Sequence, residues 1–340
     1  MLANYFNEIG HQVIIFTAFN TVTLSCELNK CVTLTPLNLP SLKKIVSKIG
    51  KLTRDHQIDV IISNLWPLNL WVSLGLMFSE TTTKVILVEH INLSVGLRLK
   101  SRFEQFAARI FHKFLIPLNT QIVAVSDGVL ADLVENMGVK REQITAVHNP
   151  VLEFRSLENR THLRRGNTGR ANLLAVGNLK PQKDYATMIR AMKILHDQAF
   201  DFELVIAGEG PLRASIESDI KVFGLKDRIC LLGETVSTST LYLKADVYVL
   251  SSKWEGFGNT LVEALSYGCK VVSTDCPSGP SEILCSGTYG ILVPPENPAA
   301  LADAIREAFQ GELNNEGLRA HCLKFSDFTI GSKYLRLCDL

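Results

Sequence analysis

Two carboxylates with seven residues between them, Glu255 and Glu263, offer the clearest chemistry in this sequence. They lie in the segment 246–268. Its first part, 246–250, is short, apolar and β-prone, which is typical of a buried parallel strand. The Gly-Phe-Gly run at 256–258 allows positive φ and a close approach of the backbone. The segment therefore predicts a strand, a tight turn beside Glu255, and a helix that carries Glu263 one turn from its start.

This arrangement fits a site for a phosphorylated sugar. A loop that joins the carboxyl end of a parallel strand to a helix is where α/β sheets bind ligands. Backbone N–H groups at the helix start favour an anion such as phosphate, and we expect Asn259 or Thr260 to cap this helix. Glu263 would repel a phosphate but could accept hydrogen bonds from a sugar or ribose hydroxyl, and Glu255 could serve a second sugar. An ordinary strand-turn-helix with one solvated glutamate and one glutamate at the helix start explains the same residues equally well.

The pair of glutamates with EGFGNT at the turn resembles the E-x7-E signature of retaining glycosyltransferases, specifically glycosyltransferase family 4 of the GT-B fold. The segments 276–284 and 289–301 look like the next part of that family's sequence, and 176–185 looks like its phosphate-contacting loop. The resemblance covers nearly the whole chain and is strongest across 171–308. It implies an α/β protein with two Rossmann-like doubly wound domains that face a cleft.

The alternation of strand-like and helix-like runs also predicts two doubly wound sheets. We expect an acceptor-side domain over 1–152, a linker over 153–170, a nucleotide-sugar domain over 171–325, and a helix over 326–340 that crosses back to the first domain. The first helix, 1–9, has no strand before it, whereas the resembled family begins with a strand and a Gly-rich loop. A truncated chain, a mis-assigned start and a protein that does without the loop are the alternatives.

The resemblance also implies roles for single residues. Glu263 would hold the ribose, Lys183 would bind the leaving diphosphate, and Glu255 and His90 would grip the donor sugar from opposite sides. Asn178 stands where the family often has an arginine, so a neutral hydrogen bond replaces a charge-assisted one of roughly twice the strength. The other residues expected to bind the donor are Gly177, Phe257, Gly258, Asn259, Thr260 and Leu261.

Three further patterns carry weaker predictions. The Gly-Glu-Gly run at 208–210 follows a strand, as in a dinucleotide-binding fingerprint, but Arg213 stands where that fingerprint has its third glycine. The run is therefore weak evidence for an NAD site. The run 40–56 predicts a basic helix with a solvated face, and contact with an anionic membrane is its alternative. The run 97–114 predicts a helix with one basic and one apolar side. We expect its apolar side to pack against the sheet, and an interfacial helix is the alternative. That side consists of Leu99, Phe103, Phe106, Ile110 and Phe114.

Composition limits the function further. The chain has 340 residues, of which 46% are hydrophobic and 20% charged, as in soluble globular proteins with room for two domains. A net charge of +1 gives no case for a nucleic-acid partner. The eight cysteines form no C-x-x-C pair, so we expect reduced, mostly buried thiols. No D-x-D occurs, so we expect neither a metal ion nor another cofactor.

The resemblance implies a retaining, hexosyltransferase-type glycosyltransferase in cell-surface polysaccharide or lipopolysaccharide biosynthesis. The donor would be a nucleotide sugar, with UDP expected first and GDP next, and the acceptor a glycan or lipid-linked glycan. We expect a cytoplasmic protein, with peripheral contact at the inner membrane face as a further expectation. A truncated, inactive nucleotide-sugar-binding protein and a nucleotide-sugar 2-epimerase remain alternatives. The sugar, base, linkage, acceptor and oligomeric state are not encoded in the patterns.

Overall fold

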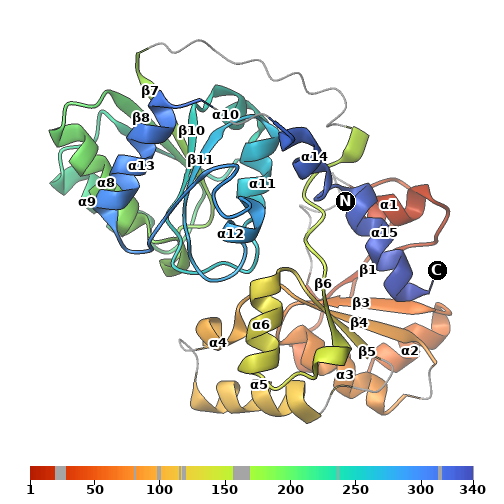
Figure 1. Cartoon of the computed structure of the whole chain (residues 1–340). Coiled ribbons are helices and arrows are strands. Elements are labelled where there is room, and N and C mark those ends of the chain that lie inside the picture. The colour runs from red at the N-terminus through yellow and green to blue at the C-terminus, as the bar shows by residue number, and fades with distance from the viewer. Residues whose placement is uncertain are drawn as a thin grey trace. The chain divides into compact units, whose positions relative to one another are not determined.

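A computed structural model of the chain describes residues 1–19, 28–79, 82–97, 101–114, 116, 120–155, 169–235, 237–312 and 316–339. The chain divides into two compact units. The first contains Met1–Glu153 and Phe325–Leu340, and the second contains Phe154–Lys324 (Figure 1). Most of the predicted linker lies outside the described residues.

The first unit combines a pair of parallel strands with a four-stranded parallel sheet in the order β3-β4-β5-β6. Its first elements are α1 (Leu2–Glu8), β1 (Ile14–Thr17), β2 (Thr33–Pro36), the 3-10 helix η2 (Leu42–Ile45) and α2 (Ile49–Asp55). The elements that follow are β3 (Val60–Asn64), α3 (Leu68–Met77), β4 (Lys84–Glu89), α4 (Leu93–Gly96), α5 (Arg102–Phe114), β5 (Thr120–Ala124), α6 (Asp127–Glu135), η4 (Arg141–Gln143) and β6 (Ile144–Ala146).

Two predictions for helices of this unit are wrong. The run 40–56 forms two helices, η2 and α2, because its first turn closes through i→i+3 bonds such as that from the Lys44 N–H to the Ser41 carbonyl. In α5, the side that packs inward contains Ala108, Phe111 and His112. The phenylalanines that we expected to pack on the sheet are exposed instead, namely Phe103, Phe106 and Phe114. Leu99 lies outside the described residues.

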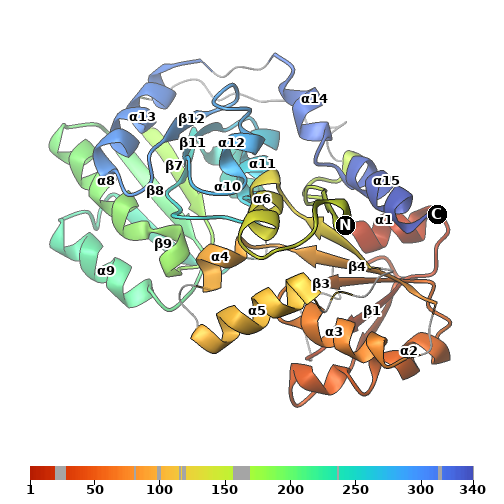
Figure 2. The ribbon, with the colours of Figure 1, turned by 60° about the horizontal axis from the view of Figure 1, so that its bottom comes forward.

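The last helix, α15 (Asp327–Cys338), belongs to the first unit and packs against α1 (Figure 2). Gly331 makes this contact close, because a Cβ at that position would lie 2.2 Å from Cδ1 of Tyr5. The Tyr5 hydroxyl lies 3.2 Å from Oγ of Ser332, and its ring meets that of Phe328 edge-on. Residues at opposite ends of the sequence therefore form one packed layer.

The second unit has a six-stranded parallel sheet in the order β12-β11-β10-β7-β8-β9. Its first elements are β7 (Ala171–Val176), the 3-10 helix η5 (Pro181–Lys183), α8 (Tyr185–Asp197), β8 (Phe202–Ala207), α9 (Arg213–Val222), β9 (Ile229–Gly233), α10 (Ser239–Lys244) and β10 (Val247–Leu250). The remaining elements are α11 (Asn259–Ser266), β11 (Lys270–Thr274), α12 (Pro280–Ile283), β12 (Ile291–Val293), α13 (Pro298–Gln310) and α14 (Leu318–Leu323).

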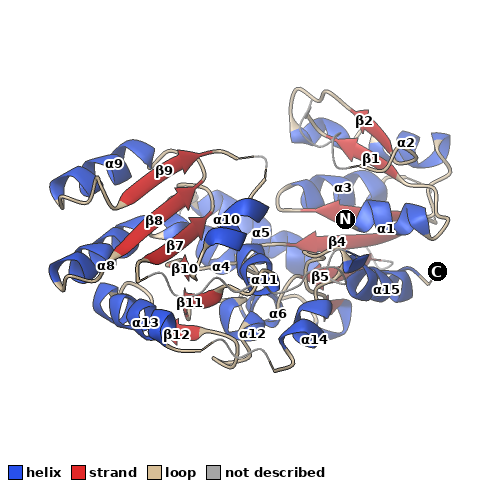
Figure 3. Cartoon of the chain, turned by 90° about the horizontal axis from the view of Figure 1, so that it is seen from above, coloured by secondary structure: helices blue, strands red, loops and turns tan. Residues whose placement is uncertain are grey.

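Helices cover both faces of this sheet, with α8, α9 and α13 on one face and α10 and α11 on the other (Figure 3). The strand order reverses between β7 and β10, where two crossovers run in opposite directions. In doubly wound sheets the crevice at such a reversal, outside the carboxyl ends of the strands, is where ligands bind. The predicted α/β class with parallel sheets is confirmed.

The cysteines and the lengths of the helices bear on two further expectations. The described cysteines are all free thiols, and Cys26 lies outside the described residues. Four of them are buried, namely Cys269, Cys276, Cys322 and Cys338. Among the helices that the structure describes, none has both the length and the apolar character needed to cross a membrane.

Candidate active site

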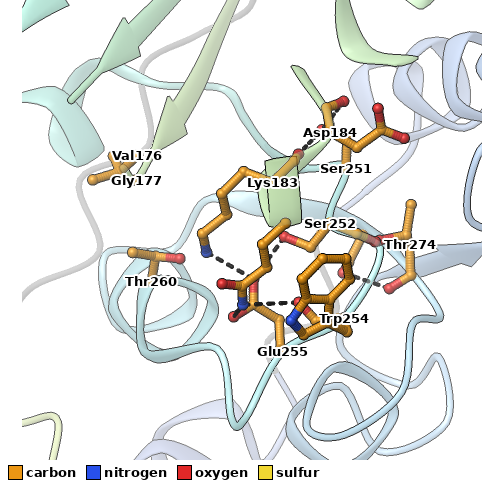
Figure 4. A network of polar contacts seen from close by, with 12 residues as sticks. Val176, Gly177, Lys183, Asp184, Ser251, Ser252, Trp254, Glu255, Thr260 and Thr274 are labelled. Carbon is orange, nitrogen blue, oxygen red and sulfur yellow. Dashed lines mark hydrogen bonds and ion pairs between the residues drawn. The ribbon is translucent and has the colours of Figure 1, made fainter. Parts of the chain in front are cut away.

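The loops after β7 and β10 meet at the strand-order reversal of the second unit and bring Lys183 and Glu255 together. Nζ of Lys183 lies 2.7 Å from Oε1 of Glu255, and the two side chains are 16% and 7% exposed (Figure 4). The Ser252 hydroxyl donates to the same carboxylate oxygen at 2.6 Å. Nε2 of Gln182 donates to the other oxygen, Oε2, at 3.4 Å. Glu255 is therefore a member of a buried ion pair within its loop.

Further hydrogen bonds hold the two loops against each other. The Ser251 hydroxyl lies within hydrogen-bonding distance of the carbonyl oxygens of Lys183, at 2.8 Å, and Asp184, at 3.1 Å. The Lys253 N–H donates to the Gln182 carbonyl at 2.8 Å. Asp184 adopts a left-handed conformation and caps α8. The backbone on both sides of Lys183 is thus fixed, which directs its side chain toward Glu255.

Burial also sets the protonation of two groups beside this ion pair. Burial, and then the charge of Glu255, raise the pKa of Tyr185 well above its ordinary value. The Tyr185 hydroxyl consequently stays protonated and donates to the Gly177 carbonyl at 2.9 Å. The same two causes, in the same order, raise the pKa of Cys276 to about 12. Neither group offers an ionised nucleophile near neutral pH.

Glu263 lies on α11 and is held by a tyrosine that the sequence analysis did not identify. The Tyr242 hydroxyl, on α10, donates to Oε2 of Glu263 at 2.7 Å. Burial is the largest cause that raises the pKa of Tyr242, and neighbouring Tyr248 and Glu263 add to it. Tyr242 is therefore a permanent donor. The contact joins residues 21 positions apart on different helices, so no local pattern could have revealed it.

The start of α11 differs from the prediction. Gly258, with φ of 105°, is the N-cap, and no side chain caps the helix. Neither Asn259 nor Thr260 takes this role. The Thr260 hydroxyl instead accepts a hydrogen bond of 2.7 Å from the hydroxyl of Tyr248, a fully buried residue of β10. A buried phenol needs a hydrogen-bond partner, and Tyr248 has this threonine, which lies inside the helix and past its N-cap position.

The other residues expected to bind the donor are arranged around these loops. Asn178 and Asn259 are exposed, and Gly177 accepts the Tyr185 bond described above. Phe257 and Leu261 are 3% and 0% exposed, so only their backbone could meet a ligand. Gly279 lets the loop after β11 approach Phe257, because a Cβ there would lie 1.7 Å from the Phe257 carbonyl oxygen.

The Gly-Glu-Gly turn after β8 has a structural explanation. A Cβ at Gly208 would lie 2.1 Å from the Gly177 carbonyl oxygen, and one at Gly210 would lie 2.6 Å from that of Leu179. The Leu179 N–H donates to the Glu209 carbonyl at 2.9 Å. These glycines let the turn lie against the loop that leads to Lys183.

Among the described residues no group of three or more His, Cys, Asp or Glu is arranged to hold a metal ion.

His90 belongs to the first unit and follows β4. Its Nε2 lies 3.1 Å from Oδ1 of Asn64, an oxygen that can only accept, so Nε2 carries the proton. Burial lowers the pKa of His90, and the neighbouring Glu89 opposes that shift in part. The imidazole is therefore neutral near pH 7, with its lone pair on Nδ1.

A second buried polar cluster, missed by the sequence analysis, holds the end of β4 next to His90. Nδ2 of Asn69 donates to Oε1 of Glu89 at 2.9 Å and to the Val88 carbonyl at 3.0 Å. His112 of α5 places Nε2 3.4 Å from the same Glu89 oxygen, while its Nδ1 lies 2.8 Å from the Ala108 carbonyl. A carbonyl only accepts, so Nδ1 must donate.

Comparison with known proteins gives one family model for each half of the chain. Residues 1–152 match the model described as Glycosyltransferase Family 4. Residues 163–324 match the model described as Glycosyl transferases group 1.

One similar protein is the N-acetylgalactosamine-N,N'-diacetylbacillosaminyl-diphospho-undecaprenol 4-alpha-N-acetylgalactosaminyltransferase of Campylobacter jejuni. It is 28% identical over 267 residues, which cover 78% of this chain and 71% of that protein.

Two solved structures share the fold over almost the whole chain. A glycosyltransferase from Rickettsia africae has a TM-score of 0.78 at 19% identity and covers 99% of this chain and 92% of its own. Anabaena HepE, in complex with UDP and glucose, has a TM-score of 0.76 at 17% identity and covers 100% and 95%. The two family models show that the chain belongs to the glycosyltransferases, with the family 4 model over residues 1–152 and the group 1 model over residues 163–324. The solved structures show that it shares the GT-B fold.

Proposed function

We propose that this glycosyltransferase binds a nucleotide sugar at the strand-order reversal of its second unit and transfers the sugar with retention at the anomeric carbon. The observation that carries the proposal is the buried ion pair of Lys183 and Glu255. A cation beside a carboxylate, both at the carboxyl ends of parallel strands, matches the two parts of such a donor. The cation suits the diphosphate, and the carboxylate suits the hydroxyls of the sugar.

In this proposal Lys183 stabilises the leaving diphosphate. An ammonium group has three donors, so Lys183 can bond Glu255 and phosphate oxygens at the same time. Stabilising the charge that develops on the leaving group is the main electrostatic task of such a reaction. The N–H groups of Gly258, Asn259 and Thr260 at the start of α11 add to it, and Asn178 supplies a neutral donor. We expect this set to act without a metal ion.

Glu263 would recognise the ribose. A carboxylate has about four acceptor positions, so the Tyr242 hydrogen bond leaves capacity for ribose hydroxyls. Tyr242 would fix the direction of the carboxylate, because its hydroxyl stays protonated. Glu263 is a donor-binding residue in this account, and Tyr242 is a positioning residue.

Glu255 and His90 would hold the donor sugar. Nδ1 of His90 carries a lone pair, because Nε2 donates to Asn64. A neutral His90 can therefore accept a hydrogen bond from a sugar hydroxyl. We assign no residue as a covalent nucleophile, and we propose that retention proceeds without a covalent enzyme intermediate.

For the donor base and the acceptor, the named relatives supply the reasons. The HepE structure is a complex with UDP and glucose, so UDP is the first candidate for the nucleotide of the donor. The name of the Campylobacter jejuni relative describes a diphospho-undecaprenol acceptor. We therefore propose a lipid-linked glycan as the acceptor and polysaccharide biosynthesis as the setting, with contact at the inner membrane face.

The test is a calorimetric titration of UDP and of GDP into the wild type and Lys183→Ala. A hydrogen bond to a charged group contributes about 1.5–3 kcal/mol, so we expect Lys183→Ala to weaken the preferred nucleotide by roughly 10- to 100-fold. Lys180→Ala, an exposed lysine in the same loop, is the matched control and should bind as the wild type does. Failure of both nucleotides to bind at millimolar concentration would overturn the proposal in favour of an inactive protein.

A further inference from the structure

Gln182, one residue before Lys183, joins the two loops of the candidate site through both its backbone and its side chain. It is the middle residue of the 3-10 helix η5, and its carbonyl accepts the Lys253 N–H at 2.8 Å. Its side chain reaches the same loop, where Nε2 donates to the Trp254 carbonyl at 2.9 Å. These two contacts fix the side chain of Gln182 beside Glu255.

The amide group of Gln182 can take only one of its two flipped orientations here. A carbonyl oxygen and an ionised carboxylate only accept hydrogen bonds, so the NH2 group must face the Trp254 carbonyl and Oε2 of Glu255. Its two N–H donors serve these two contacts. The amide oxygen, Oε1, consequently lies on the opposite side of the group, and no donor among the described residues contacts it.

The carboxylate of Glu255 retains one acceptor position, and that position is on the oxygen beside Gln182. A carboxylate has about four such positions, two on each oxygen. The Lys183 ammonium and the Ser252 hydroxyl use both positions of Oε1, at 2.7 and 2.6 Å. Gln182 uses one position of Oε2, at 3.4 Å. Two acceptors, the second position of Oε2 and the amide oxygen of Gln182, therefore belong to neighbouring groups.

The protein holds these two acceptors in place by itself. The Thr274 hydroxyl donates to the Ser252 carbonyl at 2.6 Å, and the Glu255 N–H donates to the Pro277 carbonyl at 3.0 Å (Figure 4). Together with the contacts of Gln182, these bonds prevent the acceptors from turning toward a different partner. A preorganised pair of acceptors recognises a ligand that brings two donors in matching positions.

We propose that Gln182 is a specificity-determining residue of the donor site, whose amide oxygen accepts a hydroxyl of the donor sugar next to the hydroxyl that Glu255 accepts. The pair selects a sugar with two neighbouring free hydroxyls. A sugar that lacks one of them leaves an acceptor unpaired, and sites built to bond a hydroxyl reject such analogues strongly. The inference rests on the proposed function and names the class of sugar that the same site takes.

The experiment is a calorimetric titration of UDP-glucose and UDP-galactose, and of their deoxyfluoro analogues that each replace one sugar hydroxyl. A C–F group has no proton to donate, so each analogue removes one donor. For the sugar that binds better, we expect two neighbouring positions to be sensitive. The analogue that faces Glu255 should bind about 10- to 100-fold more weakly, and the analogue that faces Gln182 about three- to tenfold more weakly.

Gln182→Met separates a role in specificity from a purely structural one. Methionine keeps the length of the side chain but has no amide oxygen, so the three- to tenfold loss for the analogue that faces residue 182 should disappear, by about the same factor. The loss for the analogue that faces Glu255 should remain. Gln198→Met is the matched control, because Gln198 is an exposed glutamine at the C-terminal end of α8, and it should retain both losses.

The same pattern of losses in Gln182→Met as in the wild type would overturn the inference, since Gln182 would then only join the loops. Sensitive hydroxyls that are not neighbours, or a sugar that adds no affinity over UDP, would also overturn it. UDP itself lacks the sugar, so its affinity should be the same in the wild type and Gln182→Met. Intact UDP binding in any of these cases leaves the donor proposal standing, whereas loss of UDP binding by the wild type would remove both.

Discussion

Each unit buries one glutamate beside a basic side chain at the carboxyl end of an inner strand, and the two pairs differ in their access to solvent. In the second unit the side chain of Lys183 keeps 16% of its surface exposed beside Glu255. In the first unit Glu89 and His112 are both 1% exposed. A pair with one partner at the surface can exchange part of its contact for a ligand. A fully enclosed pair can only join the elements that carry it, here β4 and α5.

The largest effect should come from opening the enclosed pair. Glu89→Ala leaves His112 and Asn69 buried without their common partner, so we expect the free energy of unfolding to fall by about 3–5 kcal/mol in urea denaturation. Glu203→Ala removes an ion pair with Arg170 whose side chains are 44% and 41% exposed. That control should cost less than about 1 kcal/mol. Similar losses for the two variants would show that the Glu89 cluster is not a structural link.

An effect of intermediate size, on stability and on the transfer rate, should come from the protonation of His90. Its folded pKa is lowered below 6.5, so the neutral form predominates above that pH. The unfolded chain binds the proton more readily, so the stability from neutral His90 is present above pH 6.5 and is lost as pH falls through the lowered pKa. The transfer rate should decline over the same acidic range.

His90→Gln tests this assignment because glutamine retains an acceptor but does not titrate. We expect about a tenfold lower rate at pH 7.5 and no acidic decline attributable to residue 90. The affinity for UDP itself, which lacks the sugar, should not change. An unaltered acidic decline in the variant would assign it to another group.

The smallest effect should come from Tyr242→Phe, which removes one hydrogen bond to Glu263 and keeps the ring. We expect UDP affinity to fall about three- to tenfold, corresponding to roughly 1 kcal/mol. Tyr289→Phe in the same unit is the control, because its hydroxyl bonds the Glu316 carbonyl elsewhere. Equal affinities for the two variants would remove Tyr242 from the donor site.

The sequence predicted the fold class well because strand and helix periodicities are local and the Gly-rich turns mark the loops. It could not predict the contacts that define each pair. Lys183 meets Glu255 across 72 positions, and Glu89 meets Asn69 across 20 positions on a different element. Such partners depend on sheet order, which the patterns do not encode.

Two errors have the same origin: a local sequence pattern does not encode how the surrounding structure places a helix. Thr260 was a plausible cap, but the turn at Gly258 starts the helix one residue before it, and its hydroxyl bonds buried Tyr248 instead. The apolar side of α5 was a plausible inner side, but periodicity shows that a side is apolar and not that it is buried. In α5 the contacts of Phe111 and His112 decided the matter, and they turned Phe103 and Phe106 outward.

The central claim is that the pair of Lys183 and Glu255, in which the lysine is partly exposed, serves the nucleotide sugar, and that the fully enclosed pair of Glu89 and His112 does not. Its most direct test is the titration of UDP into the wild type, Lys183→Ala and Glu89→Ala at a temperature where all three are folded. We predict about tenfold or greater weakening for Lys183→Ala and an unchanged affinity for Glu89→Ala. Undiminished UDP binding by Lys183→Ala, or equal weakening by both variants, would contradict the account.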